Sequence, residues 1–242
     1  MIARDERPLR AVPRAVFAAL ATALLLQIGW QSTQPRPVAR AQALAAPPPV
    51  AMLRIASLGE PVPFAQLMTL YLQAFDNQPG ISIPFRELDY QRVIEWLAAI
   101  LALDPRGQYP LLMASQVYAQ VPDPARTRLM FDFVYQQFLR DPDRRWRWLA
   151  HASLVAKHRL KDQPLALYYA REIARLAPAA PGWARQMQIF ILEDLGEIES
   201  AKILLGALLS TGEIHDEHEL KFLNDRLQTM QDAGKSTPST RN

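Results

Sequence analysis

The residues best suited to recognition chemistry are basic and lie in the stretch DRRWRWLAHASLVAKHRL. Arg144, Arg147, His151 and His158 follow one another at intervals of 3, 4 and 7 residues, so they share one strip if this stretch is helical. Guanidinium and imidazolium groups bind carboxylates and phosphates. We therefore expect these four residues to form a partner-binding strip for an acidic peptide or a lipid headgroup. The alternative is a solvated face that pairs with acids of a neighbouring segment, such as Asp132.

A second histidine pair, His215 and His218, lies in the segment HDEHE with three acids. Histidines at i and i+3 can gather around a divalent cation, but the segment lacks the His-Glu-x-x-His arrangement of zinc peptidases. The acids also suit the first turn of a helix running to Met230, because carboxylates stabilise the positive end of a helix. We expect no metal site, with His215 and His218 as the candidates if a metal binds.

Catalytic motifs are absent from the sequence. The chain has no cysteine, no Gly-x-Ser-x-Gly elbow and no phosphate-binding glycine loop. We therefore predict that the protein is not an enzyme and uses no cofactor.

The positive charge belongs to the N-terminus. The net charge is +3, but residues 1–51 hold six arginines against two acids, which leaves 21 basic and 22 acidic residues for the remainder. A protein that binds nucleic acid carries its positive charge on the folded domain. We therefore expect no nucleic-acid partner.

An apolar segment near the N-terminus predicts a membrane anchor. Residues 15–30 carry no charge, and their length is near the lower limit for crossing a bilayer. The arginines before this segment favour a cytoplasmic location for that end. We expect residues 1–14 to be a cytoplasmic basic N-terminus and residues 15–30 a single transmembrane signal anchor. The alternative is a secretory signal cleaved near Ala39-Arg40-Ala41.

Two further segments lack the pattern of a packed domain. Residues 31–51 contain five prolines among alanines, which is typical of a semi-stiff, extended linker. Residues 231–242 are polar without apolar periodicity, and we expect a disordered tail. The folded domain is thus predicted at residues 52–230.

Helical repeats account for this domain. Apolar residues recur at helical spacing, and Pro105, Pro142 and Pro178 end successive units at intervals of 37 and 36 residues. Periods of this length indicate stacked helix pairs. We predict an all-α fold, an antiparallel helix-pair solenoid, preceded by the single N-terminal transmembrane helix.

The clearest internal match has a constant offset of 35 residues and pairs Trp148 with Trp183 and Ala166 with Ala201. In the segments LKDQPLALYYAREIARLAP and LGEIESAKILLGALL the chain resembles the tetratricopeptide repeat family, in its membrane-anchored bacterial form. Ala166 and Ala201 match the small residues at the helix crossing of that family, and Pro178 matches its closing proline. The resemblance implies a solenoid that binds a protein segment along a concave surface.

Three local features of the domain can also be predicted. Trp148 and Trp183 occupy the same place in the apolar stripe, so both are expected to be buried in repeat packing. Asp143 is expected to be the N-cap of the helix that follows it. Residues 77–88 contain a turn signal and an extended strip; we expect a connector, with docking of a partner strand as the alternative.

These features together predict a membrane-anchored scaffold or assembly factor for protein–protein interaction. Its expected partners are proteins of a membrane or envelope complex. Its expected location is the bacterial inner membrane, single-pass, with the N-terminus cytoplasmic and the C-terminal domain periplasmic. The alternative is a periplasmic metal-binding accessory protein or hydrolase that uses His215 and His218.

Overall fold

The computed structural model describes residues 12–34, 41–212, 214 and 216–235, with the side chains of residues 233–235 left out. The described residues form an all-α protein of eleven α-helices with one two-residue strand pair. The chain divides into an N-terminal unit that holds helix α1 and a main body that holds the other helices. The predicted fold class is therefore confirmed at the level of an all-α chain.

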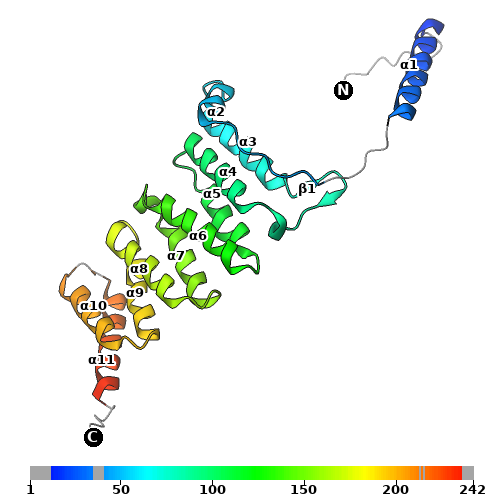
Figure 1. Ribbon diagram of the computed structural model, residues 1–242. Helices are drawn as coiled ribbons and strands as arrows, with labels where there is room; N and C mark the ends of the chain where they lie inside the picture. The colour runs from blue at the N-terminus through cyan, green and yellow to red at the C-terminus, as the bar shows by residue number, and fades with distance from the viewer. Residues whose placement is uncertain (1–11, 35–40, 213, 215, 236–242) are drawn as a thin grey trace, which may run out of the picture. The chain divides into compact units, whose positions relative to one another are not determined.

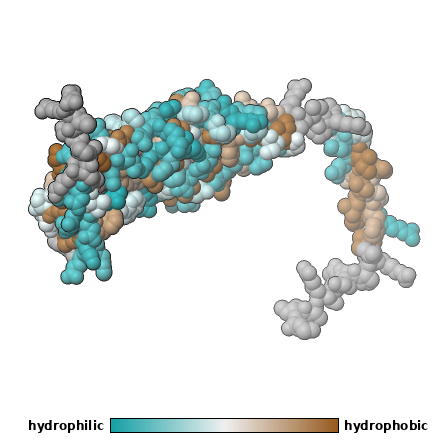
Figure 2. All heavy atoms as spheres, turned by 90° about the horizontal axis from the view of Figure 1, so that it is seen from below, coloured by the Kyte–Doolittle hydropathy of each residue, from teal (hydrophilic) through white to brown (hydrophobic). Residues whose placement is uncertain are grey.

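The N-terminal unit contains one long apolar helix. Helix α1 (Arg14–Thr33) follows Pro13, has 20 residues and a mean hydropathy of 1.4, and buries none of its side chains. Its surface is almost continuously hydrophobic (Figure 2). It is long and apolar enough to cross a membrane, as an anchor or as a signal sequence. It begins one residue before the predicted segment, 15–30, and ends three residues after it.

The main body is a series of helices that follow one another in chain order (Figure 1). Its α-helices are α2 (Val50–Ala56), α3 (Pro61–Ala74), α4 (Tyr90–Leu103), α5 (Tyr109–Leu112), α6 (Pro124–Phe138), α7 (Pro142–His158), α8 (Gln163–Leu176), α9 (Gly182–Asp194), α10 (Ile198–Ser210) and α11 (Glu217–Lys235). Shorter elements are the strands β1 (Asn77–Gln78) and β2 (Ile81–Ser82), the 3₁₀ turns η2 (Phe85–Glu87) and η4 (Tyr118–Gln120), and the π-helical turn η3 (Met113–Val117).

Consecutive helices pack against each other. Helix α3 packs on α4, and each helix from α6 to α10 packs on the helix that follows it. Because the connections are short, neighbouring helices must run in opposite directions. The result is a row of helix pairs held by contacts between sequence neighbours.

Aspartates and prolines fix several helix starts. The side chains of Asp89, Asp123 and Asp162 accept hydrogen bonds from backbone N–H groups of the first turns of α4, α6 and α8. The expected N-cap at Asp143 is wrong, because α7 begins one residue earlier, at Pro142, where a proline is favoured. Asp143 instead accepts a hydrogen bond of 3.0 Å from the backbone N–H of Ala179, in the loop that follows α8.

Small residues lie where the helices of a pair cross. Ala166 and Ala201 are fully buried, as the repeat pattern predicts. Next to Ala166, the hydroxyl of buried Ser153 on α7 donates a 2.8 Å hydrogen bond to the Ala166 carbonyl on α8. Such a bond requires close approach of the two helices, and a larger side chain than alanine would prevent it.

Part of the predicted linker belongs to the main body. Leu44 is only 6% exposed, and the Trp96 indole N–H donates a 2.8 Å hydrogen bond to the Ala45 carbonyl. The Gln78 side chain bonds both backbone groups of Gln42. The linker prediction for residues 31–51 is therefore wrong for residues 42–51, because one leucine and one indole tie this stretch to the core. Residues 35–40 lie outside the described part of the chain.

The other predicted boundaries also shift. Helix α11 continues to Lys235, so the predicted tail, 231–242, begins too early; residues 236–242 lie outside the described part. The predicted connector at residues 77–88 consists of the hairpin β1–β2 and the turn η2. Gly80 has a φ of 79° at the hairpin turn, a conformation that glycine adopts without strain.

Candidate functional site

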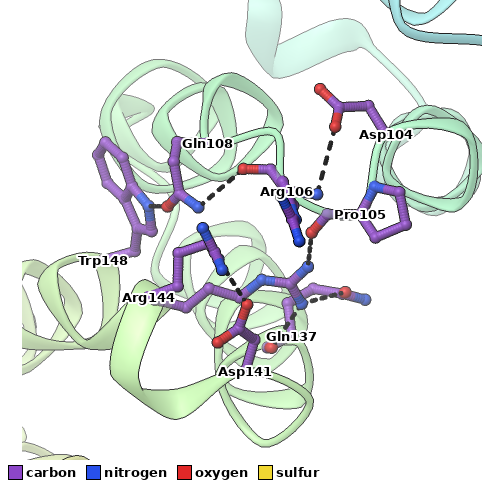
Figure 3. Close-up of polar contacts among 9 residues, drawn as sticks. Asp104, Pro105, Arg106, Gln108, Gln137, Asp141, Arg144 and Trp148 are labelled. Carbon is purple, nitrogen blue, oxygen red and sulfur yellow. Dashed lines mark hydrogen bonds and ion pairs between the residues drawn. The ribbon is translucent and has the colours of Figure 1, made fainter. Parts of the chain in front are cut away.

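The basic stretch singled out from the sequence lies on α7, and one side of this helix contacts the preceding helices. The Arg145 guanidinium Nη2 donates a 2.8 Å hydrogen bond to the Pro105 carbonyl. The Trp148 indole N–H donates a 2.7 Å bond to the Gln108 side chain (Figure 3). Trp148 is 9% exposed, which confirms its predicted burial.

The other side of α7 contacts α9. The rings of Trp146 and Trp183 meet edge to face with their centroids 5.4 Å apart. Lys157 forms an ion pair with Asp194 near the end of α9. Both flanks of α7 are therefore occupied by neighbouring repeats.

A third side of α7 remains open, and it carries most of the predicted strip. Arg144, Arg147, Leu154 and His158 are all exposed. At about 100° per residue they lie opposite the stripe that faces α8. We call these four residues the α7 face.

The two arginines of the α7 face are oriented but still accessible. Arg144 forms an ion pair of 2.7 Å with Asp141, one turn earlier in the chain (Figure 3), and its side chain is 46% exposed. If the strip were a solvated face, Asp132 was its expected acidic partner, but Arg144 pairs with Asp141 instead. The Arg147 guanidinium lies 5.8 Å from the centre of the Trp146 ring, within cation–π range. No carboxylate pairs with Arg147 among the described residues.

His151 departs from the predicted strip. Its Nε2 is buried without a hydrogen-bond partner, and the ring bonds the backbone of Ser115, in the π-helical turn η3. Burial lowers the pKa of His151 below its ordinary value of 6.5, against the opposing effect of the Ser115 hydrogen bond. His151 is therefore a neutral packing residue at neutral pH, and the expectation that it belongs to an exposed basic strip is wrong.

Trp183 is 54% exposed, so its predicted burial is wrong. Trp148 lies well inside α7, whereas Trp183 is the second residue of α9. At this helix start the Trp146 ring meets the Trp183 ring edge to face. The offset of 35 residues aligns the two tryptophans in the sequence, but the different helix starts place them in different environments.

Trp183 is one of four aromatic side chains on α7, α9 and α11 that we call the aromatic row. The row consists of Trp146, Trp183, Phe190 and Phe222. Phe190 on α9 and Phe222 on α11 have ring centroids 6.3 Å apart, and Phe222 is 55% exposed. Helix α7 thus presents exposed arginines, and helices α9 and α11 present the exposed rings of Trp183 and Phe222.

Most side-chain links between helix pairs span about one repeat. They join residues separated by 33 to 40 positions, as in Arg128–Asp162, Tyr135–Glu172, Gln186–Glu219, Arg226–Glu193 and Trp148–Gln108. Each repeat is therefore connected to its immediate neighbours, which is the arrangement of a linear repeat array.

Comparison with protein-family models, curated proteins and solved structures gave no match.

Arg145 is the residue that sequence reasoning missed. It is only 4% exposed; its Nη1 donates to the Gln137 backbone and side-chain oxygens at 2.7 and 3.1 Å, while its Nη2 reaches the end of α4. Burial lowers the pKa of Arg145, although a guanidinium stays charged. The sequence does indicate this burial, because Arg145 lies four residues before Leu149 and so continues the apolar stripe of α7.

Of the two predicted metal candidates, only His218 lies in the described part of the chain. His218 is exposed in the first turn of α11, and His215 lies outside the described residues. Asp216 accepts a 2.8 Å bond from the Glu219 backbone N–H, so one of the nearby acids starts the helix, as expected. Within the described residues, no cluster of three histidine or acidic side chains has the geometry to hold a metal.

A cavity of about 400 Å³ lies among α8, α9, α10 and α11. Its polar wall includes Gln186 and Glu219, which bond each other at 2.5 Å, and its apolar wall includes Ile189 and Leu208. These polar groups satisfy each other, so the cavity has less to offer a ligand than the exposed α7 face.

Proposed function

We propose that the protein is a membrane-anchored scaffold whose helical repeats bind a segment of a partner protein. The observation that carries this proposal is the α7 face with the adjoining aromatic row. Helix α7 leaves two arginines exposed, and helices α9 and α11 each leave an aromatic ring exposed, so the three helices together offer cationic and aromatic side chains. Aromatic residues and arginine are the groups that most often anchor protein–protein interfaces.

The helical body supports a tetratricopeptide-like solenoid as the framework. Its helix pairs cross at Ala166 and Ala201, and its side-chain links span one repeat. In such a solenoid the first helices of successive pairs line one continuous surface. Helices α7, α9 and α11 hold that position in the chain order, which makes their open sides the binding surface.

The chemistry of this surface favours a partner segment with acidic and apolar residues. Arg144 and Arg147 supply exposed guanidinium groups for carboxylates, and Trp183 and Phe222 supply exposed rings for apolar side chains. Asp141 holds Arg144 in place, which reduces the entropy lost when it binds.

Helix α1 supports the proposed membrane anchor and the proposed location of the protein. Four arginines precede or begin this helix and no acid lies within it, which favours an orientation with the N-terminus in the cytoplasm. In this proposal the main body lies on the periplasmic side of a bacterial inner membrane and gathers proteins of a membrane or envelope complex.

The test is co-purification of the tagged full-length protein from its native membrane in mild detergent. We expect stoichiometric partner proteins with the unmodified chain and their loss in the Arg144→Glu/Arg147→Glu variant. The matched control is Arg86→Glu/Arg171→Glu, which makes the same change in charge at two exposed arginines outside the α7 face. Equal recovery of partners with both double variants would remove the α7 face from the binding surface.

A further inference from the structure

Helix α3 has an apolar side that is exposed among the described residues. It packs on α4 through buried Ala65, Met68 and Leu72. Away from this contact, Leu67 and Leu70 are 59% and 61% exposed. These two leucines lie on the side where a preceding repeat would stack, because α3 begins the series of helix pairs.

Helix α2 and the turn that follows it also expose apolar side chains. Leu53 is buried, but Met52, Ile55 and Leu58 are 60%, 77% and 90% exposed. We call Met52, Ile55, Leu58, Leu67 and Leu70 the end face. Arg54 and Glu60 are the only charged residues between positions 42 and 75. The outer side of a terminal repeat is ordinarily polar, so an apolar end face indicates a surface that is covered in the working protein.

The chain that leads to α1 is attached beside the end face. Trp96 donates its indole N–H to Ala45, and its ring lies 5.0 Å from the ring of Tyr71, which follows Leu70 on α3. Helix α1 ends at Thr33 and the attached stretch begins at Gln42. Nine residue steps span at most roughly 30 Å when fully extended. The stretch attached to the main body therefore begins within about that distance along the chain from the end of α1.

We propose that the end face lies against the lipid bilayer in which α1 is anchored. This inference rests on the proposed membrane anchor. The exposed leucines, isoleucine and methionine enter the boundary between headgroups and acyl chains, and Arg54 reaches the lipid phosphates. The short tether favours this contact over one with a second copy, because it holds the face and the bilayer at high effective concentration. Contact with the bilayer orients the body at its N-terminal end and leaves the α7 face free for its partner.

The absence of cysteine from the chain allows a direct test in the full-length protein. Single cysteines at Ile55 and Leu70 on the end face, Ile203 on α10 and Leu25 in α1 each receive an environment-sensitive fluorophore. Ile203 is the matched control, because it is an exposed aliphatic residue, 70% accessible, far along the chain from the end face. The labelled proteins are reconstituted in vesicles of phosphatidylethanolamine and phosphatidylglycerol, with and without a lipid-attached quencher.

We expect a blue shift and quenching by the lipid-attached quencher at Ile55 and Leu70, approaching the quenching at Leu25, and neither effect at Ile203. Quenching at Leu25 with none at Ile55 and Leu70 would overturn the inference while leaving the anchor intact. A blue shift at Leu70 without quenching, accompanied by dimer formation, would also overturn it and assign the end face to a second copy. No quenching at Leu25 would reject the anchor itself and, with it, this inference.

Discussion

Arg144 and Arg145 are neighbours in the sequence with opposite environments. Arg145 is buried and bonds three oxygens at the ends of α4 and α6, whereas Arg144 is exposed and bonds one acid of its own turn. We expect Arg145→Met to lower the free energy of unfolding by roughly 2–3 kcal/mol, because buried carbonyls lose charge-assisted donors. Arg144→Met should change it by less than about 1 kcal/mol.

Urea unfolding of the two variants, followed by circular dichroism, measures both changes. Equal stability of the two methionine variants would show that the buried guanidinium does not hold the repeats together.

His151 gives the protein a pH-dependent stability. Its pKa is lowered by burial in the folded state, so the unfolded chain binds a proton more readily. The stabilisation is therefore complete above the ordinary pKa of 6.5 and is lost as the pH falls through the lowered folded value. We expect the free energy of unfolding to decrease as the pH falls below the ordinary value of 6.5, and His151→Gln to reduce that decrease.

The exposed His158 provides the comparison. Thermal unfolding of His158→Gln across the same pH range should retain the decrease of the unmodified protein. A decrease of the same size in the His151→Gln protein would assign the effect to other groups.

The sequence predicts whether a single side chain is buried only where the apolar stripe of its helix is clear. The stripe predicts the burial of Trp148, and applied to Arg145 it would have predicted that burial too. It fails for Trp183, because the stripe does not show where α9 begins. The burial of His151 depends on the π-helical turn η3 of another repeat, which leaves no periodic signal in the sequence.

The paired helices depend on small residues at their crossings. Ala166 and Ala201 have no exposed surface, so a leucine at either position must push the two helices apart. We expect Ala166→Leu or Ala201→Leu to cost about 1–3 kcal/mol of stability. Ala207→Leu, at an exposed position of α10, should change it by less than about 0.5 kcal/mol. Thermal unfolding of the three variants makes the comparison. A loss of stability in Ala207→Leu as large as in Ala201→Leu would show that the helix crossings do not require a small residue.

The helices themselves were predictable, and their connections were less so. Apolar periodicity, together with prolines and aspartates at helix starts, indicates the helices from α6 to α10. Composition alone assigned residues 42–49 to a free linker, although the stretch is tied down by Leu44 and the Trp96–Ala45 hydrogen bond. Such contacts join positions about fifty residues apart, and local pattern cannot reveal them.

For the molecule as a whole, membrane attachment depends on α1. We expect Leu24→Arg/Leu25→Arg to release the protein from membranes during alkaline extraction, since each arginine at the centre of a span costs roughly 2.5–3.5 kcal/mol. The control is Ser32→Arg/Thr33→Arg, at the end of the helix, where an arginine side chain reaches the interface. The intact mass of the membrane-bound protein should include residues 1–41; a mass that lacks them would identify α1 as a cleaved signal.

The row of links that each span one repeat has a mechanical consequence. If a partner pulls on the far end while α1 holds the near end, the load passes through every joint in series. Each joint then carries the same force, and the weakest yields first. The body would extend in steps of one helix pair and shorten again when the force is removed, as a series of elastic elements between the membrane and its load.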